Sequence, residues 1–278
     1  MKRDIRLIAL DLDGTLLTDN KTVTEHTKQT LYKVMEQGVI VMPATGRGIE
    51  AIPEEVKAIK GMPYALTVNG AAVMEFDTRK VLYSDYLDCE TTLLALDYGF
   101  SWDALPDVYV GGKAYSERSR FENIEHYVSG ILQKEMMIKS RTPVDDLRQF
   151  VKEHPDQIEK VNVIFYDMDE RKRAYEYWEK DERLMTTCSM DNNIELNSKT
   201  ATKGRALIAF AKTLGIHPEQ IMVCGDSNND LEMIRMAGLG VAMGNAIEEV
   251  KKEADFITKT NEEDGVAYAI EQFVLAKN

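Results

Sequence analysis

The sequence predicts an α/β protein with a Rossmann-like, doubly wound parallel sheet and an inserted α+β domain. Toward both ends of the chain, short apolar runs of strand length alternate with stretches of helix length, an order typical of parallel strands joined by right-handed crossovers. The middle of the chain loses this order and holds most of the aromatic residues. A length of 278 residues is also above the usual single-domain size. We therefore expect a core built from residues 1–84 and 195–278 and an α+β insertion over residues 85–194.

The N-terminal segment is expected to begin the core sheet. Residues 5–10 form an apolar run that predicts a buried strand, and this run ends at Asp-Leu-Asp-Gly-Thr. A helix is expected over residues 24–37, because Thr24 is a suitable N-cap and Gly38 a suitable stop. The other elements expected here are a strand over 39–44, a helix up to about residue 60, a third parallel strand over 64–68 and a hairpin of strands 72–76 and 81–83.

The C-terminal segment returns to the same pattern. Residues 203–214 place their apolar side chains on one helical face, and Gly215 follows them. Residues 220–224 predict a strand that runs into Gly-Asp-Ser-Asn-Asn-Asp. The elements expected beyond it are a helix to about residue 237, strands near 241 and at 256–257, a helix over 246–252 and a last helix over 265–274. The elements expected within the insertion are strands over 161–166 and 185–189 and a helix over 144–152.

The composition argues against several classes of protein. The net charge is −13, so binding to nucleic acid or to an anionic membrane is not expected. No stretch approaches the roughly 20 apolar residues that cross a bilayer, and the N-terminal apolar run is too short for a signal peptide. Cys89, Cys188 and Cys224 are too widely spaced for a zinc pattern. We therefore expect a protein of the reducing cytoplasm, and the sequence does not predict its oligomeric state.

Four polar clusters stand at the carboxyl ends of expected strands or at the start of the next helix, which is where open parallel sheets bind ligands. The first cluster holds Asp11 and Asp13. A carboxylate can attack phosphorus to form an aspartyl-phosphate, and a second one can protonate the leaving alkoxide and then deprotonate water. The alternative is a solvated turn, since Asp and Gly are common turn residues. The position directly after an apolar strand favours the reactive pair.

The other three clusters supply groups that suit a phosphate and a metal ion. Thr45 and Gly46 offer a hydroxyl and an open backbone amide at a helix N-terminus, and Lys203 offers an ammonium group. Asp226 and Asp230 lie four residues apart across a strand-to-helix turn, and hard oxygen ligands of this kind suit Mg²⁺. Taken singly, each cluster has a structural alternative: a helix cap, a surface lysine or a capping turn.

Charge repulsion links the clusters. Carboxylates that meet at one sheet edge would repel one another, at a cost of several kcal/mol for a pair about 4 Å apart at an effective dielectric near 20. A divalent cation and the ammonium of Lys203 would offset this repulsion, and the cation would also bridge the nucleophile to a phosphoryl oxygen. The four acids together therefore predict a bound Mg²⁺.

With these clusters in this order, the sequence resembles the haloacid dehalogenase superfamily, and more narrowly the Cof-type subclass IIB hydrolases, which include the YidA-like sugar phosphatases. The resemblance covers residues 4–84 and 195–274. It includes Thr-Val-Asn-Gly-Ala at 67–71, Gly-Val-Ala-Met-Gly-Asn-Ala at 240–246 and Asn-Glu-Glu-Asp-Gly-Val-Ala at 261–267. It implies a Mg²⁺-dependent hydrolase of small phosphorylated metabolites, with sugar phosphates first among them, and an α+β cap domain that selects the substrate.

The resemblance also implies roles for individual residues. Asp11 would be the nucleophile and a Mg²⁺ ligand, and Asp13 would be the general acid and base and would touch the metal through its backbone carbonyl. The remaining roles would be phosphate binding by Thr45, Gly46, Lys203, Asn229 and the backbone amide of Leu12, metal binding by Asp226 with the support of Asp230, and substrate contact by Asn69.

Other interpretations remain open. The substrate could be flavin mononucleotide, pyridoxal phosphate or a nucleotide.

A phosphomutase would use the same groups, but residues 16–24 are too short for the helical cap that such enzymes insert there, and a dehalogenase needs neither Asp13 nor Mg²⁺. The glycines of residues 238–244 nearly match a dinucleotide fingerprint, yet the third is one residue late. A thiol phosphatase would need Arg six residues after Cys224, where Asp230 stands. A catalytically silent regulatory relative would typically lack one of the acids, and none is missing.

Overall fold

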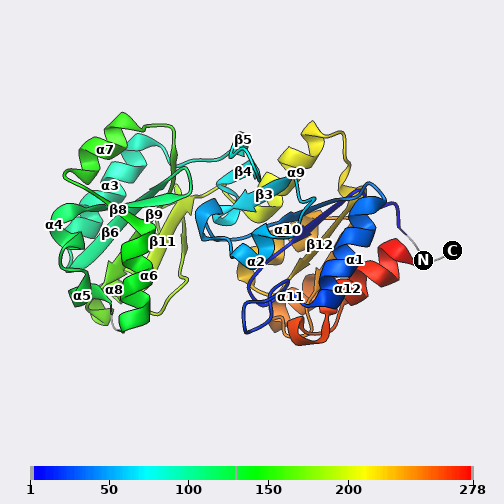
Figure 1. Ribbon diagram of the computed structural model, residues 1–278. Helices are drawn as coiled ribbons and strands as arrows, with labels where there is room; N and C mark the ends of the chain where they lie inside the picture. The colour runs from blue at the N-terminus through cyan, green and yellow to red at the C-terminus, as the bar shows by residue number, and fades with distance from the viewer. Residues whose placement is uncertain (1–2, 129, 277–278) are drawn as a thin grey trace. The chain divides into compact units, whose positions relative to one another are not determined.

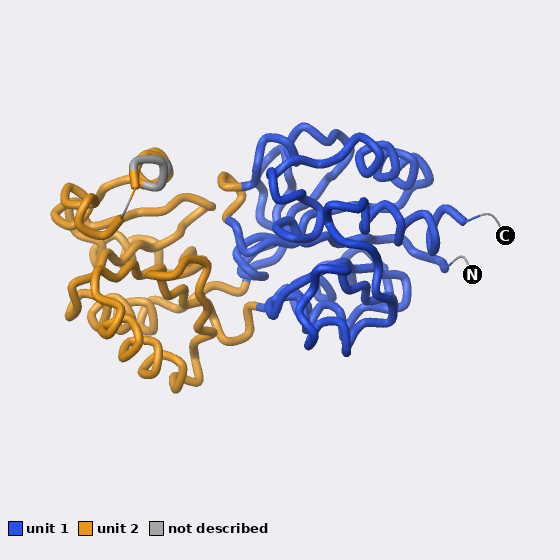
Figure 2. The backbone as a smooth tube through the Cα atoms, turned by 90° about the horizontal axis from the view of Figure 1, so that it is seen from below, with its two compact units in different colours: residues 1–47, 52–84, 202–278 blue, residues 48–51, 85–201 orange. Residues whose placement is uncertain are grey.

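The computed structural model describes residues 3–128 and 130–276, and these form two compact units (Figure 2). Unit 1 holds the residues up to 47, residues 52–84 and the residues from 202 onward, and unit 2 holds residues 48–51 and 85–201. The junction after the insertion thus falls after residue 201 instead of after residue 194, where the sequence placed it. The reason is that residues 193–198 form a strand that pairs within the sheet of unit 2.

Unit 1 is built on a five-stranded parallel sheet with the strand order β14-β13-β12-β1-β2 (Figure 1). Its strands are β1 (Leu7–Leu10), β2 (Ile40–Pro43), β12 (Ile221–Gly225), β13 (Leu239–Ala242) and β14 (Phe256–Ile257). β1 is an interior strand, because Leu10 pairs with Pro43 on one side and with Cys224 on the other. β1, β12 and β13 are buried along their whole length, as expected for parallel strands covered on both faces. The carboxyl ends of β1, β2 and β12 therefore lie side by side.

Helices cover both faces of this sheet. They are α1 (Glu25–Glu36), α2 (Glu54–Lys57), α9 (Lys203–Thr213), α10 (Leu231–Met236), α11 (Glu248–Glu253) and α12 (Gly265–Ile270), the last continued by a π-helical turn at Glu271–Leu275. The step from β1 to β2 and the step from β12 to β13 run in opposite directions along the sheet, so right-handed crossovers place α1 and α10 on opposite faces. α1 lies beside α12, and α10 packs against α9 and α11 (Figure 1). This arrangement confirms the predicted doubly wound α/β class.

Helix α1 begins and ends where the sequence predicts. The side chain of Thr24 accepts a hydrogen bond from the backbone N–H of Thr27 at 3.1 Å, which satisfies one of the free donors of the first turn. Gly38 follows the helix with a φ of 84°, a conformation that glycine adopts without steric cost. Leu31 and Val34 are fully buried, so the apolar stripe faces the core.

The third predicted parallel strand is present, but its ladder belongs to a small antiparallel sheet, so only its predicted place in the parallel core sheet was wrong. β3 (Tyr64–Thr67) pairs with β4 (Ala72–Glu75), which pairs in turn with β5 (Val81–Ser84); β4 and β5 form the predicted hairpin. β3 ends in a tight turn in which Asn69 has a left-handed φ of 56°, and this turn folds β4 back onto β3. A parallel bridge between Ala44 and Leu66 connects β3 to the end of β2.

Unit 2 contains a six-stranded sheet with the order β10-β11-β9-β6-β7-β8, in which β7 and β8 are parallel and the other neighbours are antiparallel. Its strands are β6 (Ala104–Val110), β7 (Lys113–Glu117), β8 (Arg141–Val144), β9 (Ile158–Phe165), β10 (Leu184–Thr187) and β11 (Asn193–Ser198). Its helices are α3 (Cys89–Phe100), α4 (Arg118–Phe121), α5 (Ile124–Tyr127), α6 (Ile131–Ser140), α7 (Leu147–Glu153) and α8 (Met168–Trp178). The predicted α+β character of the insertion is present, and the elements predicted within it correspond to β9, β10 and α7.

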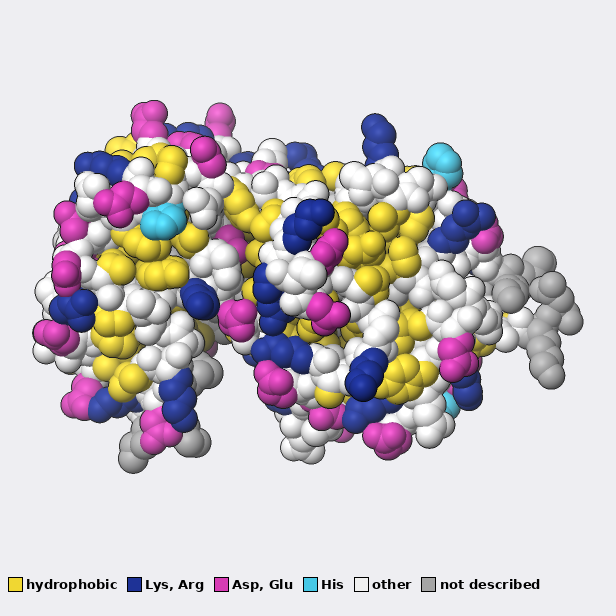
Figure 3. All heavy atoms as spheres, turned by 45° about the horizontal axis from the view of Figure 1, so that its top comes forward, with side chains coloured by type: hydrophobic (Ala, Val, Ile, Leu, Met, Phe, Trp, Pro, Cys, Tyr) yellow, Lys and Arg dark blue, Asp and Glu magenta, His cyan; other side chains and the backbone are white. Residues whose placement is uncertain are grey.

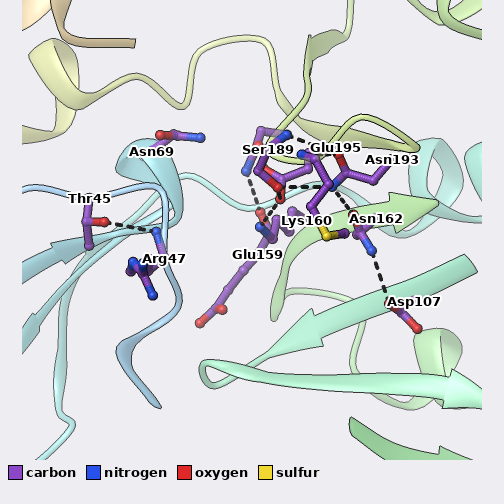
Figure 4. Close-up of polar contacts among 12 residues, drawn as sticks. Thr45, Arg47, Asn69, Asp107, Glu159, Lys160, Asn162, Ser189, Asn193 and Glu195 are labelled. Atoms are coloured by element: carbon purple, nitrogen blue, oxygen red, sulfur yellow. Dashed lines mark hydrogen bonds and ion pairs between the residues drawn. The ribbon is translucent and has the colours of Figure 1, made fainter. Parts of the chain in front are cut away.

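The two faces of this sheet differ in chemistry. On one face, Val108 of β6 and Val161 and Val163 of β9 pack into an apolar core with residues of α3, α7 and α8. On the other face, polar side chains, all of them at least partly buried except Ser189, are joined by hydrogen bonds and ion pairs, several of which Figure 4 shows. We call this set the polar layer; its members are Asp107, Ser116, Arg141, Lys160, Asn162, Ser189, Asn193 and Glu195.

Breaking one ion pair of the polar layer should destabilise unit 2 strongly. Arg141 Nε lies 2.8 Å from Asp107 Oδ2, and their side chains are only 6% and 0% exposed. Arg141→Met would leave a buried carboxylate without its cation, so we expect the free energy of unfolding to fall by about 3–5 kcal/mol. Urea denaturation checks this. The matched control is Arg118→Met, because the Arg118–Asp145 pair is exposed and should contribute little to stability. Equal, small losses in both variants would contradict the expectation.

The surface is mixed in charge. Acidic and basic side chains are interspersed over the face shown in Figure 3, with apolar side chains visible between them. A continuous basic patch, which binding to a nucleic-acid backbone requires, is not present on that face. No helix in the two described stretches of chain has both the length and the apolar character needed to cross a bilayer.

Candidate active site

The loop after β1 brings Asp11 to the carboxyl edge of the sheet. The backbone N–H of Asp11 donates to the carbonyl of Cys224 at 3.1 Å, so pairing with β12 continues one residue past the strand. The backbone carbonyl groups of Asp11 and Leu12 accept from Leu16 and Leu17, which closes a tight loop. Gly14 in this loop has a φ of 82°, and a Cβ there would lie 2.5 Å from an Asp226 carboxylate oxygen. Only glycine lets the loop approach Asp226 this closely.

Lys203 opens α9 and is fully buried. Its Nζ donates to Asp11 Oδ1 at 2.6 Å and to Asp230 Oδ1 at 2.7 Å. Burial alone would lower the pKa of the ammonium, but the charges of Asp11 and Asp230 raise it above its usual value. Lys203 is therefore a permanent cation held between two carboxylates.

Asp226 and Asp230 follow β12, as the sequence predicts. Asp230 Oδ2 accepts from the backbone N–H groups of Asp226 and Ser227 at 2.9 and 3.1 Å. Asp226 Oδ1 accepts from the Thr15 hydroxyl at 3.1 Å. Carboxylate oxygens of Asp11, Asp226 and Asp230 all lie within 4.8 Å of one another. Three of the four predicted acids are thus brought together from both ends of the chain, and Asp13 is not a member of this group.

The three carboxylates repel one another, and this repulsion contributes to raised pKa values for two of them. Burial and the charges of Asp230 and Asp226 raise the pKa of Asp11 to about 8, although Lys203 opposes the shift. Burial and the charge of Asp230 raise the pKa of Asp226 to about 6. One buried ammonium does not neutralise three carboxylates. The cluster fits a divalent cation, since the donors are all hard oxygens of the kind that Mg²⁺ prefers.

The two oxygens of Asp230 are already engaged by protein donors, one by Lys203 and the other by two backbone N–H groups. Asp226 keeps a carboxylate oxygen for which the described residues give no hydrogen bond, and it is only partly buried. The geometry thus favours Asp226 over Asp230 as a direct metal ligand.

Asp13 lies in a different environment from Asp11. Its side chain is 40% exposed and is held by Arg47 and by Lys21. Arg47 Nε donates to Oδ2 at 2.7 Å and Arg47 Nη2 to Oδ1 at 2.9 Å, while Lys21 Nζ donates to Oδ1 at 2.8 Å. Partial burial opposes them, but these hydrogen bonds lower the pKa of Asp13 to about 2. The two aspartates of the first cluster therefore differ in pKa by environment alone.

The residues predicted to bind phosphate at the ends of β2 and β12 form a second set of contacts with Asn69. The Thr45 hydroxyl accepts from the backbone N–H of Arg47 at 3.1 Å (Figure 4), and the Thr45 carbonyl accepts from Asn69 at 3.0 Å. A Cβ on Gly46 would lie 2.8 Å from Asn69 Oδ1. Asn69 Oδ1 also accepts from the Asn229 side chain at 3.0 Å. Thr45, Gly46, Asn69 and Asn229 are therefore brought together.

Two contacts link this second set to the acidic cluster. Arg47 connects the Thr45 loop to Asp13, and Gly70 lies so close to the start of α9 that a Cβ on it would be 2.2 Å from the Thr202 carbonyl. Sequence reasoning missed Thr15, Lys21 and Arg47 as members of the site. Arg47 and Thr15 have a visible signal, because Arg47 follows Thr45 by two residues and Thr15 ends the Asp-Leu-Asp-Gly-Thr run. Lys21 has none.

Comparisons with known proteins agree with this geometry. A family model described as haloacid dehalogenase-like hydrolase matches residues 8–270 of the chain. The chain is 32% identical over 276 residues to the 5-amino-6-(5-phospho-D-ribitylamino)uracil phosphatase YcsE of Bacillus subtilis (strain 168), with 98% of this chain and 97% of that protein covered. It is 29% identical over 286 residues to the phosphatase YwpJ of the same organism, with 97% and 100% covered.

Solved structures resemble the chain over nearly its whole length. A haloacid dehalogenase-like hydrolase from Bacteroides thetaiotaomicron is 29% identical, with a TM-score of 0.79 over 96% of this chain and 99% of that one. A haloacid dehalogenase-like hydrolase from B. subtilis is 25% identical, with a TM-score of 0.79 over 97% and 100%. The similarity therefore extends over both units.

Proposed function

Because this chain belongs to the haloacid dehalogenase-like hydrolase family, we propose that it is a Mg²⁺-dependent phosphatase that cleaves small phosphorylated metabolites through an aspartyl-phosphate on Asp11. The observation that supports this most directly is the buried triad in which Lys203 bonds to both Asp11 and Asp230 beside Asp226. A relative of this length is a phosphatase of a compound with a phosphorylated ribityl chain, and this favours sugar and polyol phosphates as substrates.

In the first half of the reaction, Asp11 attacks the phosphorus atom. Lys203 occupies Asp11 Oδ1 and thereby orients the carboxylate so that Oδ2 is the attacking oxygen. The bond from phosphorus to the substrate oxygen breaks as the bond to Oδ2 forms, and a protonated Asp13 gives its proton to the leaving alkoxide. Asp13 carries this proton only after it leaves the contacts with Arg47 and Lys21 that lower its pKa to about 2. In the second half, Asp13 takes a proton from water, whose oxygen attacks the same phosphorus. The products are the alcohol and inorganic phosphate, and Asp11 is restored.

The phosphoryl group needs several positive or donor groups around it. We assign them to Lys203, the side chains of Thr45 and Asn229, and the backbone amides of Gly46 and Leu12, with Asn69 holding Asn229 in place. Asp11, Asp226 and the backbone carbonyl of Asp13 would hold Mg²⁺, with Asp230 in support. The ion would neutralise charge on the phosphoryl oxygens. Unit 1, which holds the residues up to 47, residues 52–84 and the residues from 202 onward, then supplies the catalytic groups, and the α+β unit is the cap that selects the substrate.

Metal binding is tested by stability as well as by activity. We expect excess EDTA to abolish hydrolysis of p-nitrophenyl phosphate. We also expect Mg²⁺ at about 100 times its Kd to add about 2.7 kcal/mol to the free energy of unfolding. Asp226→Asn should lose both effects, whereas Asp77→Asn, at an exposed position in the β4–β5 turn, should keep them. Full activity in excess EDTA would reject the metal.

The role of Asp13 is tested by the leaving group. The value of kcat/KM reports the steps up to leaving-group departure, and general acid catalysis contributes about 10²–10⁴-fold. Asp13→Asn should therefore lower kcat/KM strongly for sugar phosphates and phenyl phosphate. The loss should be smaller for p-nitrophenyl phosphate, because nitrophenolate leaves without protonation. Equal losses on all three substrates would mean that Asp13 is not the acid. A panel of phosphorylated metabolites, including flavin mononucleotide, pyridoxal phosphate and nucleotides, then identifies the substrate.

A further inference from the structure

We propose that Asn245 is a positioning residue of the metal site, which acts by holding the loop that carries Gly14 and Thr15 against Asp226. The inference rests on the proposed function, because that function makes Asp226 a ligand of Mg²⁺. Asn245 lies in the segment that follows β13, outside the four polar clusters of the site, and all the residues involved belong to unit 1.

The side chain of Asn245 bridges two segments of the chain. Its Nδ2 donates to the Gly14 carbonyl at 2.8 Å, and its Oδ1 accepts from the backbone N–H of Asn261 at 3.0 Å. Because both ends of the amide group are engaged, the side chain is held in one orientation although it is exposed to solvent. Asn245 thus ties the loop after β1 to the 3₁₀ turn after β14, at Asn261–Glu263.

This turn is itself anchored to the loop after β1. The side chain of Asn261 is buried, and its Nδ2 donates to the Leu17 carbonyl at 3.1 Å and to Asp19 Oδ1 at 3.2 Å. The loop is therefore held at two points, by Asn245 at Gly14 and by Asn261 at Leu17.

The part of the loop that Asn245 holds is the part that contacts Asp226. The buried Thr15 hydroxyl donates to Asp226 Oδ1 at 3.1 Å, and a Cβ on Gly14 would lie 2.5 Å from Asp226 Oδ2. The Asp226 carbonyl accepts from the backbone N–H of Ile247 at 3.0 Å, two residues after Asn245. The segment after β13 therefore holds the backbone of Asp226 and the loop beside it at the same time.

The loop needs such an anchor because glycine gives close approach without stiffness. Gly14 has a φ of 82°, and glycine populates positive and negative φ about equally. A hydrogen bond to the Gly14 carbonyl restricts this freedom and keeps Thr15 on Asp226 Oδ1. The orientation of the Asp226 carboxylate is then fixed before an ion binds. Groups that orient a metal ligand typically contribute 10–100-fold to metal affinity.

The test measures Mg²⁺ binding without turnover. Urea denaturation at a series of Mg²⁺ concentrations gives the Kd, because bound ion stabilises the folded state. We expect Asn245→Ala and Thr15→Val each to raise the Kd about 10-fold or more. The matched control is Asn123→Ala, which should leave the Kd unchanged, because Asn123 is an exposed asparagine of unit 2 whose side chain also donates to a backbone carbonyl, that of Ser119.

A double variant tests whether Asn245 acts through Thr15. In the Thr15→Val background, Asn245→Ala should add little to the loss of affinity, because both substitutions release the same contact with Asp226. An unchanged Kd in Asn245→Ala, or losses that multiply in the double variant, would overturn the inference and leave the proposed function intact.

Failure of the metal site itself gives a different result. If Mg²⁺ does not stabilise the wild type, or stabilises Asp226→Asn equally, the proposed Mg²⁺ site fails and the role of Asn245 with it. Each Kd comes from the stability of a variant with Mg²⁺ relative to the same variant in EDTA. A general loss of stability in Asn245→Ala therefore does not mimic the expected rise in Kd.

Discussion

Replacing Asp11 with Asn should remove essentially all phosphatase turnover while the protein stays folded. An amide has no anionic oxygen with which to attack phosphorus, and uncatalysed phosphomonoester hydrolysis is so slow that enzyme enhancements reach about 10²¹-fold. The substitution also removes one of three neighbouring carboxylates; burial, together with repulsion from the other two, raises the pKa of Asp11 to about 8. Lys203 keeps its bond to Asp230. The free energy of unfolding should therefore not fall.

The measurement combines turnover, trapping and stability. Hydrolysis of p-nitrophenyl phosphate in the presence of Mg²⁺ should drop to background in Asp11→Asn, and acid quenching should trap a phosphorylated protein in the wild type but not in the variant. Urea denaturation shows that the variant is folded. Asp77→Asn serves as the control for removing an exposed carboxylate. Turnover at the wild-type rate in folded Asp11→Asn would reject Asp11 as the nucleophile.

The core could be predicted from the sequence because its buried strands consist almost entirely of apolar residues. β1 and β12 are short, continuous apolar runs, and α1 has both a capping residue and a stop signal at its ends. The error at β3 shows the limit of this reasoning. An apolar run of strand length indicates a buried strand but not its partner, and here the turn at Asn69 directs β3 to β4.

The strands of unit 2 were harder to predict for a physical reason. β6 contains Pro106 and Asp107, and β11 contains Asn193 and Glu195, which in isolation are typical of loops. In the folded protein Asp107 and Asn193 are hydrogen-bonded to Asn162, and Glu195 to Lys160, both on the neighbouring strand β9, so these polar side chains can be buried. Such pairing depends on which strands become neighbours, and no local pattern contains that information.

The predicted site residues converge because each follows the carboxyl end of a strand or opens the helix behind it, and the sheet order then brings those ends together. The prediction missed contacts made by residues that do not follow a core strand directly. Arg47 and Lys21 come from two different loops, and only the folded structure shows that both donate to Asp13.

Replacing Lys203 with Met should abolish turnover and also destabilise the protein in a pH-dependent way. The variant loses the cation that bonds to Asp11 and Asp230, whose side chains are 7% and 0% exposed. Removing one partner from a buried ion pair costs about 3–5 kcal/mol. Activity is lost because Asp11 is no longer oriented and the phosphoryl group has lost a cation.

The sign of the pH dependence follows from the raised pKa values. In the metal-free wild type, Asp11 and Asp226 have pKa values of about 8 and about 6 in the folded state, against about 4 when unfolded. The folded state thus binds more protons between pH 4 and 8, so stability falls as pH rises through that window. The charge of Lys203 lowers the pKa of both Asp11 and Asp226. Without Lys203, these folded-state pKa values rise further, and the free energy of unfolding falls more steeply with pH.

The two proteins should therefore differ little in stability near pH 4, where the carboxylates are protonated, and most near pH 8. Urea denaturation in EDTA at several pH values measures this difference. Lys212→Met is the matched control, because Lys212 is an exposed lysine near the end of the same helix and should shift stability little at any pH. A loss in Lys203→Met that is the same at pH 5 and pH 8 would show that the ammonium does not act by neutralising these carboxylates.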